Sequence, residues 1–334
     1  MLPKLVNLMS LKENKMLKIG VLGAGAFGTA LAIMFSKTHE IFLFSAAKEH
    51  ADTIKLSREN EFLKGFHIHD EINVISDIKN IDFDYILWCF PVTPSLSILK
   101  KIALNINENT PIIICSKGIC ENGKFLSDEF EKILPKNDIG VLSGPNFAID
   151  IASLKFSAAD LGFKDISVAQ KICLDLSGKF MRLVPNDDII GIQVAGAIKN
   201  VIAIACGILA SVDGGQNSLA ALITLGLQEM VSIGKKLGAK KETFYCLSGI
   251  GDLLLTASSE TSRNMQFGKR LGLGESVNHI FSTSHSVNEG AVCVDYVVNT
   301  VDSNAIICRT VSDIMHGKKE PGSILEVCQR NTVA

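Results

Sequence analysis

The segment that most constrains the fold lies near the start of the chain. A short apolar run at residues 17–22 leads directly into the sequence GAGAFG at residues 23–28, and an alanine-rich stretch at residues 29–37 follows at once. A strand, a G-x-G-x-x-G turn and a helix in this order are typical of a dinucleotide-binding βαβ unit. A glycine-rich turn of some other α/β protein is the alternative interpretation.

Each glycine of this motif has a distinct task in a dinucleotide site. Gly23 allows a tight turn, and Gly25 has no side chain, so that the backbone can approach a pyrophosphate. Gly28 lets the following helix close onto the strand. The phosphate charge would then face the amide donors at the N-terminus of the helix.

Further short apolar runs predict the rest of a sheet. They lie at residues 40–44, 85–90, 111–115 and 139–142, and residues 156–163 and 180–184 add two more around a predicted helix at 166–176. Continuous apolar strands separated by helical or irregular segments indicate a parallel sheet that is covered on both faces.

The strand pattern stops beyond Asp188, where helical spacing takes over at residues 189–212, 218–237 and 287–298. We therefore predict an α/β protein with an N-terminal Rossmann-like doubly wound sheet followed by an all-helical C-terminal domain. The expected division is a disordered extension at residues 1–15, a dinucleotide-binding domain at 16–190 and a helical substrate-binding domain at 191–334. The boundary is expected between residues 185 and 195.

Charge and composition limit the classes of partner that the protein is expected to bind. The formal net charge is −2, which gives no electrostatic case for nucleic acid or an anionic membrane. The longest strongly apolar stretch, residues 201–212, is shorter than the roughly 20 residues that a spanning helix needs. Residues 1–15 lack a signal-peptide pattern, and the nine cysteines form no C-x-x-C pair. We expect a cytoplasmic protein with buried cysteines and no metal site.

Two lysines stand in apolar surroundings. Lys117 is a lone charge just after the strand at residues 111–115, at the sheet edge where ligands bind in open α/β folds. Lys199 lies within the most apolar helix of the chain. Each lysine either extends its ammonium group to solvent or is held in a site, where burial would suit Lys199 for acid–base chemistry.

Two further groups have both a structural and a functional interpretation. Asp252 stands between glycines and an apolar run, as a helix N-cap or as part of a site. Ser262, Arg263 and Asn264 open a helical segment at residues 265–271. They could bind a phosphate at the helix N-terminus, or serve as a cap with a surface salt bridge.

Taken together, the chain resembles the bacterial-type NAD(P)-dependent glycerol-3-phosphate dehydrogenase family. The resemblance covers about residues 16–330, in family order. The matching segments are GAGAFGTALA from Gly23, SKG from Ser116, LSGPNFA from Leu142, GAIKNVIAIACGI from Gly196, LSGIGDLLLT from Leu247, SRN from Ser262 and NEG from Asn288.

The resemblance implies reversible reduction of dihydroxyacetone phosphate to sn-glycerol 3-phosphate by NADH or NADPH, for phospholipid synthesis, in a cytoplasmic homodimer. It implies that Lys199 is the proton donor and acceptor, that Asp252 orients substrate and lysine, and that Lys117 adds positive charge. The implied substrate contacts also include Gly144, Asn146, Ser262, Arg263 and Asn264. The implied cofactor contacts are Ala26, Phe27, Ala148, Val287 and Glu289 beside the glycines, with Arg263 and Lys117 shared between the ligands.

The chain departs from the family pattern at several positions. Ser45, Ala46 and Ala47 stand where the family commonly has an arginine or histidine, and the nearest charge is Lys48. No acid is present there to bind the ribose 2′-hydroxyl or to repel a 2′-phosphate. We therefore expect both cofactors to work, with a modest preference for NADPH. The other departures are Gln193, Leu225 and Asn146.

Two alternatives remain at this point. One is a related two-domain dehydrogenase for another hydroxy compound, which would not need the run Ser262–Asn264. The other is a catalytically silent dinucleotide sensor, which would be expected to lose Lys199 and the phosphate-binding run.

Overall fold

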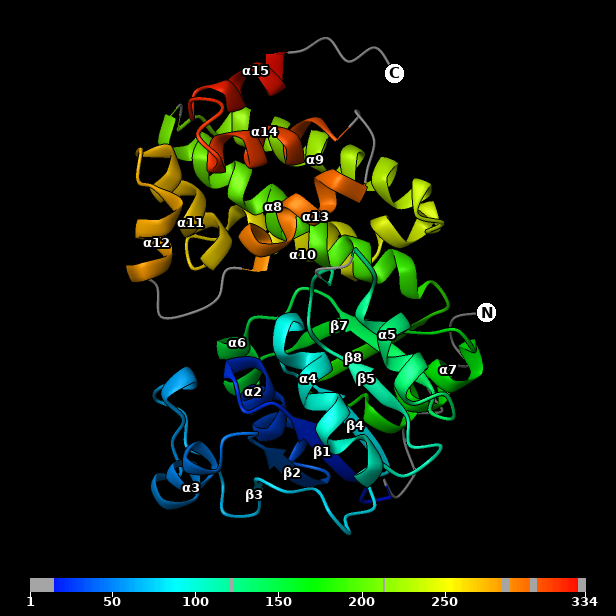
Figure 1. Cartoon of the computed structure of the whole chain (residues 1–334). Helices are drawn as coiled ribbons and strands as arrows, with labels where there is room; N and C mark the ends of the chain where they lie inside the picture. Colours follow the sequence, from blue (N-terminus) through cyan, green and yellow to red (C-terminus); the bar gives the residue numbers. More distant parts are fainter. Residues whose placement is uncertain (1–14, 121–122, 213, 284–288, 301–304, 330–334) are drawn as a thin grey trace.

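The computed structural model describes residues 15–120, 123–212, 214–283, 289–300 and 305–329. Nearly all of the predicted extension at residues 1–15 lies outside these ranges, and so does Val287. The chain forms two halves, a sheet covered by helices and a bundle of helices, which meet across the carboxyl ends of several strands (Figure 1).

The N-terminal half is an eight-stranded sheet in the order β3-β2-β1-β4-β5-β6-β7-β8. Its strands are β1 (Lys18–Leu22), β2 (Glu40–Phe44), β3 (Asn73–Ile75), β4 (Tyr85–Trp88), β5 (Ile112–Ile114), β6 (Ile139–Ser143), β7 (Ser157–Phe163) and β8 (Met181–Asn186). Its helices are α2 (Ala26–Phe35), α3 (Lys48–Ser57), α4 (Val92–Ile102), α5 (Leu126–Ile133), α6 (Ala148–Ala152) and α7 (Ile166–Leu176). The predicted Rossmann-like architecture is confirmed.

The sheet differs from the prediction in two respects. The edge strand β3 was not predicted, because it is only three residues long and carries little apolar pattern. Strand β7 runs antiparallel to β6, with Ser143 opposite Asp160, although β7 and β8 are parallel to each other. Both faces of the sheet are covered, so β7 is as apolar as a parallel strand and its direction cannot be read from its pattern.

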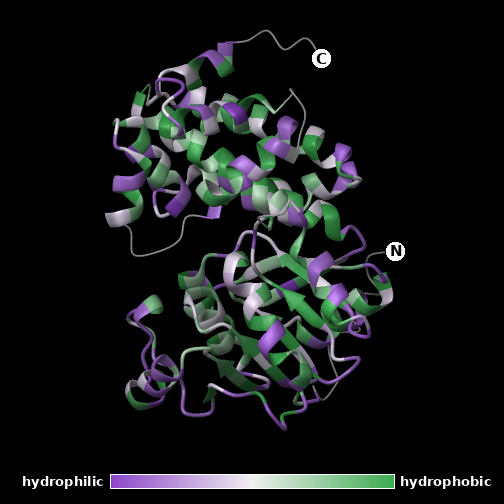
Figure 2. Ribbon diagram, viewed as in Figure 1, coloured by the Kyte–Doolittle hydropathy of each residue, from purple (hydrophilic) through white to green (hydrophobic). Residues whose placement is uncertain are grey.

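Helices and the turns that connect them make up the described residues of the C-terminal half. It contains α8 (Ile189–Val212), α9 (Gln216–Lys236), α10 (Asp252–Ser258), α11 (Arg263–Gly272), α12 (Val277–Thr283), α13 (Glu289–Thr300), α14 (Ile306–Met315) and α15 (Ser323–Gln329). A π-helical turn, Leu247–Gly251, directly precedes α10. Apolar residues dominate the strands and α8, while the outer helices mix apolar and polar residues (Figure 2).

Helix α8 is the core of this half. It is long and apolar enough to be a candidate membrane span, but 94% of its most apolar window is buried inside the protein, as expected for the central helix of a bundle. Close contact with α11 depends on two glycines. A Cβ on Gly207 would lie 2.1 Å from the carbonyl oxygen of Met265, and one on Gly268 would lie 2.0 Å from that of Ile204. The backbones of α8 and α11 therefore touch.

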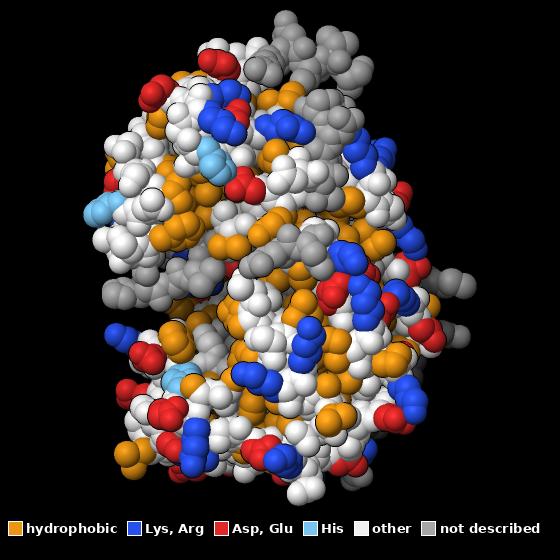
Figure 3. Space-filling view, viewed as in Figure 1, with side chains coloured by type: hydrophobic (Ala, Val, Ile, Leu, Met, Phe, Trp, Pro, Cys, Tyr) orange, Lys and Arg blue, Asp and Glu red, His pale blue; other side chains and the backbone are white. Residues whose placement is uncertain are grey.

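The surface carries acidic and basic side chains intermixed over the visible face (Figure 3). All nine cysteines are free thiols. Six of them are buried and Cys246 is exposed, so the expectation of buried cysteines fails at that position.

The buried Glu229 of α9 fixes the start of α14. One carboxylate oxygen accepts from the backbone N–H of Ile307 at 2.7 Å and the other from that of Cys308 at 2.9 Å. These are among the first amides of a helix that has no side-chain cap of its own.

We expect Glu229→Gln to lower the free energy of unfolding by about 1–3 kcal/mol, because glutamine has one acceptor oxygen and leaves one buried amide unpaired. Urea unfolding measures the change. The exposed Glu326→Gln of α15 is the control, and an equal loss in both variants would contradict the capping role.

Candidate active site

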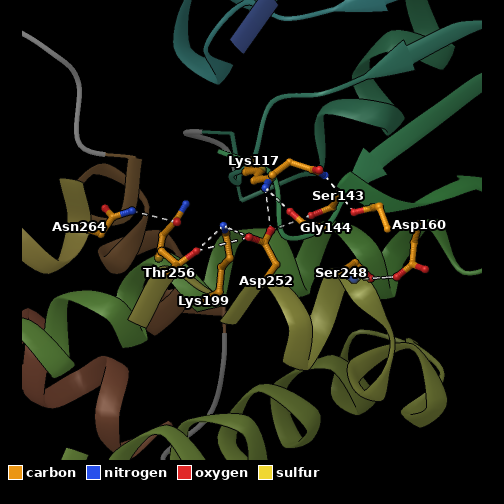
Figure 4. Close-up of polar contacts among 12 residues, drawn as sticks. Lys117, Ser143, Gly144, Asp160, Lys199, Ser248, Asp252, Thr256 and Asn264 are labelled. Carbon is orange, nitrogen blue, oxygen red and sulfur yellow. Dashed lines mark hydrogen bonds and ion pairs between the residues drawn. The ribbon is translucent and has the colours of Figure 1, made fainter. Parts of the chain in front are cut away.

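Several of the sequence-predicted site residues lie together where β5 and β6 end against α8 and α10 (Figure 4). Lys117 follows β5, Gly144 follows β6, Lys199 lies in α8 and Asp252 is the first residue of α10. The carboxyl ends of strands in an open α/β sheet are the expected place for a ligand.

Asp252 joins the two lysines. The Nζ of Lys199 donates to its Oδ1 at 2.5 Å, and the Nζ of Lys117 donates to its Oδ2 at 2.6 Å. Asp252 is 1% exposed and Lys199 5% exposed. Both ammonium groups are held by Asp252, so the alternative in which each lysine extends to solvent is wrong. The alternative of Asp252 as an N-cap is also wrong, because its carboxylate points at the lysines.

Burial sets the electrostatics of this cluster. It lowers the pKa of Lys199 to about 8, with the carboxylate of Asp252 opposing the shift and the charge of Lys117 adding to it. Burial would raise the pKa of Asp252, but the two ammonium groups outweigh it and hold that pKa below its usual value. Lys199 can therefore exchange a proton near neutral pH while Asp252 stays charged.

Three further polar groups complete the cluster. The Nζ of Lys199 donates to the Oγ1 of Thr256 at 2.9 Å, and the Oγ of Ser143 donates to Asp252 at 3.4 Å. The carbonyl oxygen of Gly144 accepts from Lys117 at 3.3 Å. Sequence reasoning missed Thr256 and Ser143. The i, i+4 spacing of Asp252 and Thr256 on one helix was the available signal for Thr256.

The run from Ser262 to Asn264 has a mixed role. The buried Ser262 caps α11 by accepting from the N–H of Met265 at 3.4 Å, as the structural interpretation expected. Asn264 donates to the Oδ1 of Asn200 at 2.9 Å and accepts from the N–H of Gly290 at 3.3 Å. This amide therefore connects α11, α8 and α13 one residue beyond Lys199.

Glu289 and Arg263 belong to the same electrostatic environment as the lysines. Burial raises the pKa of Glu289, and the positive charges of Arg263, Lys117 and Lys199 oppose the shift. Glu289 also lines a cavity of about 310 Å³ with Lys117 and with residues of α4 and α13 such as Val92 and Cys293. Lys117 therefore both lines this cavity and contacts Asp252.

Asn146, in the loop after β6, has an acceptor without a protein partner. Its Nδ2 donates to the carbonyl oxygen of Ala158 at 3.3 Å, but its buried Oδ1 accepts no hydrogen bond from the described residues. Buried polar atoms without partners are uncommon in proteins and often mark a functional site.

The glycine-rich turn fits a pyrophosphate. Gly23 has a φ of +120°, and a Cβ on it would lie 2.7 Å from the carbonyl carbon of Cys89. A Cβ on Gly28 would lie 2.0 Å from the carbonyl oxygen of Gly23, whereas one on Gly25 would meet no atom within 4 Å. Gly25 is also the N-cap of α2 without a side-chain cap, so open space faces the free amides of the helix.

The neighbouring cofactor candidates lie in the same region. Ala26 and Phe27 form the first turn of α2, and Ala148 begins α6, which packs beside α2 (Figure 1).

The end of β2 holds a network that the sequence did not reveal. The buried Ser45 hydroxyl contacts the Nδ1 of His50 at 3.1 Å, and the Nε2 of His50 contacts the Oδ1 of Asn60 at 3.3 Å. Asn60 in turn donates to the carbonyl oxygen of Ala24 at 2.9 Å, within the glycine-rich turn. Ala46 and Lys48 are exposed beside it.

No group of three or more histidine, cysteine or acidic side chains with metal-site geometry occurs among the described residues.

Comparison with protein-family models matches the two halves of the chain to the two domains of one family. The model of the NAD-dependent glycerol-3-phosphate dehydrogenase N-terminus matches residues 18–169, and that of the C-terminus matches residues 188–326. The chain belongs to the NAD-dependent glycerol-3-phosphate dehydrogenase family.

Named relatives and solved structures agree with this assignment. A glycerol-3-phosphate dehydrogenase [NAD(P)+] of Hyphomonas neptunium is 36% identical, over 90% of this chain and 91% of its own. One from Zymomonas mobilis is 37% identical, over 92% and 91%. The crystal structure of the Coxiella burnetii glycerol-3-phosphate dehydrogenase has a TM-score of 0.88 at 29% identity, covering 94% of this chain and 99% of that one.

More distant enzymes share only the fold. D-mandelate dehydrogenase is 15% identical with a TM-score of 0.61. The first alternative from the sequence, a dehydrogenase for another hydroxy compound, therefore has only this fold-level similarity in its favour.

We expect Gly25→Ala to leave the melting temperature unchanged and to weaken NADH binding by about tenfold or more, because its methyl group would occupy the space in front of the amides of α2. Gly28→Ala should instead lower stability by about 1–3 kcal/mol, because its Cβ overlaps the Gly23 carbonyl. Thermal unfolding and fluorescence titration with NADH separate the two effects. Equal NADH affinity of Gly25→Ala and wild type would contradict this cofactor site.

Proposed function

We propose that this protein is a glycerol-3-phosphate dehydrogenase that reversibly reduces dihydroxyacetone phosphate to sn-glycerol 3-phosphate, with Lys199 as the proton donor. The observation that carries the proposal is the buried Asp252 carboxylate between Lys199 and Lys117, in a chain whose family is established. Thr256 and Asp252 direct the ammonium group of Lys199, and burial brings its pKa to about 8.

The chemistry follows from these groups. The nicotinamide cofactor, when bound, supplies the hydride for reduction or accepts it for oxidation. Lys199 donates a proton to the carbonyl oxygen as negative charge develops there, and takes it back in the oxidative direction. Lys117 adds a second positive charge that stabilises the developing oxyanion. Asp252 keeps both ammonium groups in place.

The substrate phosphate is assigned to Arg263 and Asn264, at the N-terminus of α11. Gly144 and the unpaired Oδ1 of Asn146 are assigned to the other end of the substrate, where an acceptor suits a hydroxyl group. Ser262 contributes by capping the helix that presents Arg263.

The cofactor is assigned to the glycine-rich turn with Ala26, Phe27, Ala148 and Glu289, and Lys117 and Arg263 contact both ligands. Val287 is retained as a cofactor contact on the resemblance alone. We propose that NADH and NADPH both serve, because Ser45, Ala46 and Ala47 present no charge that would discriminate between them.

The wider setting is also part of the proposal. We place the domain boundary between β8, which ends at Asn186, and α8, which begins at Ile189. We propose that the enzyme is a cytoplasmic homodimer without nucleic-acid or membrane partners, and that its product enters glycerophospholipid synthesis.

An assay of dihydroxyacetone phosphate with NADH and with NADPH tests the proposed function. Unphosphorylated dihydroxyacetone is the control substrate and should react much more slowly. No oxidation of either cofactor with the phosphorylated substrate would refute the proposal and favour a catalytically silent dinucleotide-binding protein.

Lys199→Met should reduce kcat by about 10²–10⁴-fold, the usual range for loss of a general acid, while cofactor binding is retained. In the wild type, kcat/KM for reduction should fall as the pH rises through about 8, because the reaction needs the protonated lysine. For oxidation it should rise through the same pH.

The residual activity of Lys199→Met should lack this pH dependence. Lys240→Met is the matched control on the surface, where the lysine pairs with Asp187, and it should be unchanged. Activity of Lys199→Met within a few-fold of wild type would exclude the role.

Arg263→Lys keeps the charge but loses the planar fork that binds two phosphate oxygens. Loss of one charge-assisted hydrogen bond costs about 1.5–3 kcal/mol, so affinity for dihydroxyacetone phosphate should fall roughly 10- to 150-fold. Steady-state kinetics with phosphorylated and unphosphorylated substrate measure the difference.

The control for this variant is Arg270→Lys in the same helix, since Arg270 pairs with Glu275 and not with the site. If Arg263→Lys impairs both substrates equally, Arg263 does not bind the phosphate.

A further inference from the structure

Asp160 of β7 is a buried carboxylate to which the reaction assigns no task. It is 1% exposed. Its Oδ2 accepts from both the backbone N–H and the hydroxyl of Ser248, each at 2.7 Å. Within the described residues it forms no ion pair with Lys117 or Lys199, so it is not a member of the charged cluster around Asp252.

Ser248 belongs to the π-helical turn that carries Asp252. The turn runs from Leu247 to Gly251 and has no side-chain cap. The N–H groups at the start of a helical turn have no partner within it, and Ser248 is fully buried, so water cannot supply one. Asp160 is therefore the acceptor for an amide that would otherwise be buried and unpaired.

The sheet places a second support next to the first. Asp160 is directly opposite Ser143 in the antiparallel pair of β7 and β6, so the two side chains lie on the same face of the sheet. Ser143 donates to the Oδ2 of Asp252 at 3.4 Å. One cross-strand pair thus contacts both ends of the segment from Ser248 to Asp252 (Figure 4).

The path of the turn between Ser248 and Asp252 depends on its glycines and on close backbone packing. Gly249 and Gly251 lie between the two supported residues and carry no side chains that could pack. A Cβ on Gly249 would lie 2.2 Å from the carbonyl oxygen of Phe244, so the backbone there passes close to the preceding segment. π-helical turns are rare and frequently occur at functional sites.

We propose that Asp160 is a positioning residue, which fixes the π-helical turn through Ser248 and so holds Asp252 between Lys199 and Lys117. The proposal rests on the proposed function for its kinetic consequence. Asp160 belongs to the sheet half and Ser248 to the helical half, so this contact also links the two halves beside the site.

The test compares three substitutions in the full-length enzyme. Asp160→Leu has nearly the same size and cannot accept a hydrogen bond. Asp160→Asn keeps one carbonyl oxygen, which is enough because a single oxygen of Asp160 accepts both bonds. Ser248→Ala removes only the hydroxyl and serves as a milder variant if Asp160→Leu fails to fold.

The kinetic readout is the pH dependence of dihydroxyacetone phosphate reduction. In Asp160→Leu we expect kcat/KM to fall by about tenfold or more, because small misplacements of a catalytic group are costly. The high-pH decline should move to lower pH by about half a unit or more, because Lys199 loses part of the stabilising charge of Asp252. Asp160→Asn should restore both values, and Ser248→Ala should be intermediate.

Hydrogen exchange measured by mass spectrometry supplies a readout without turnover. The amides of residues 247–252 should exchange faster in Asp160→Leu than in wild type or Asp160→Asn. Glu229→Gln is the matched control, since that buried carboxylate also accepts from two groups but lies away from the site. It should lower stability without altering exchange at residues 247–252 or the pH profile.

The outcomes are distinct. The activity of the wild-type enzyme on dihydroxyacetone phosphate tests the proposed function, whereas the comparison of the variants with wild type tests the role of Asp160. If Asp160→Leu, or Ser248→Ala in its place, loses stability as Glu229→Gln does, yet keeps the wild-type pH profile and exchange pattern, Asp160 is only structural and the inference is overturned.

Discussion

The arrangement of this protein depends on one buried carboxylate. Asp252 accepts from Lys199 of the helical half and from Lys117 of the sheet half, so a single side chain joins the two halves at the point where chemistry is expected. Removing this carboxylate would leave the ammonium groups of Lys199 and Lys117 without their shared negative partner, and unpaired charges in buried positions are strongly destabilising. The correct relative position of the halves is therefore linked to the charge balance of the site.

One member of this cluster, Lys199, is a charged residue in the buried central helix α8. That helix consists mostly of apolar, buried residues. The backbones of α8 and α11 touch at Gly207 and Gly268, and Asn264 donates to Asn200 between the same helices. Burial that deep lowers the pKa of Lys199 to about 8, whereas an exposed lysine would hold its proton near pH 10. Burial in the apolar core of the bundle is thus the main cause of the lowered pKa of Lys199.

Much of this could be predicted from the sequence, and the failures have physical causes. The glycine turn, the apolar strands and helix α8 have local patterns, and Lys117, Lys199 and Asp252 stand out as charges in apolar runs. The direction of β7 and the pairing of Ser143 with Asp160 depend on contacts distant in sequence, which no local pattern encodes. By its local pattern Asp252 resembles an N-cap, and only the family resemblance placed it beside Lys199 before its contacts with the two lysines were seen.

The antiparallel strand that the sequence could not predict has a structural consequence for the site. In the antiparallel pairing of β6 and β7, Asp160 lies directly opposite Ser143. This pairing brings the side chains of Ser143 and Asp160 to one buried face of the sheet. There Asp160 accepts from Ser248, and Ser143 donates to Asp252. The last part of the sheet therefore contacts the helical half, while the glycine-rich turn follows its first strand.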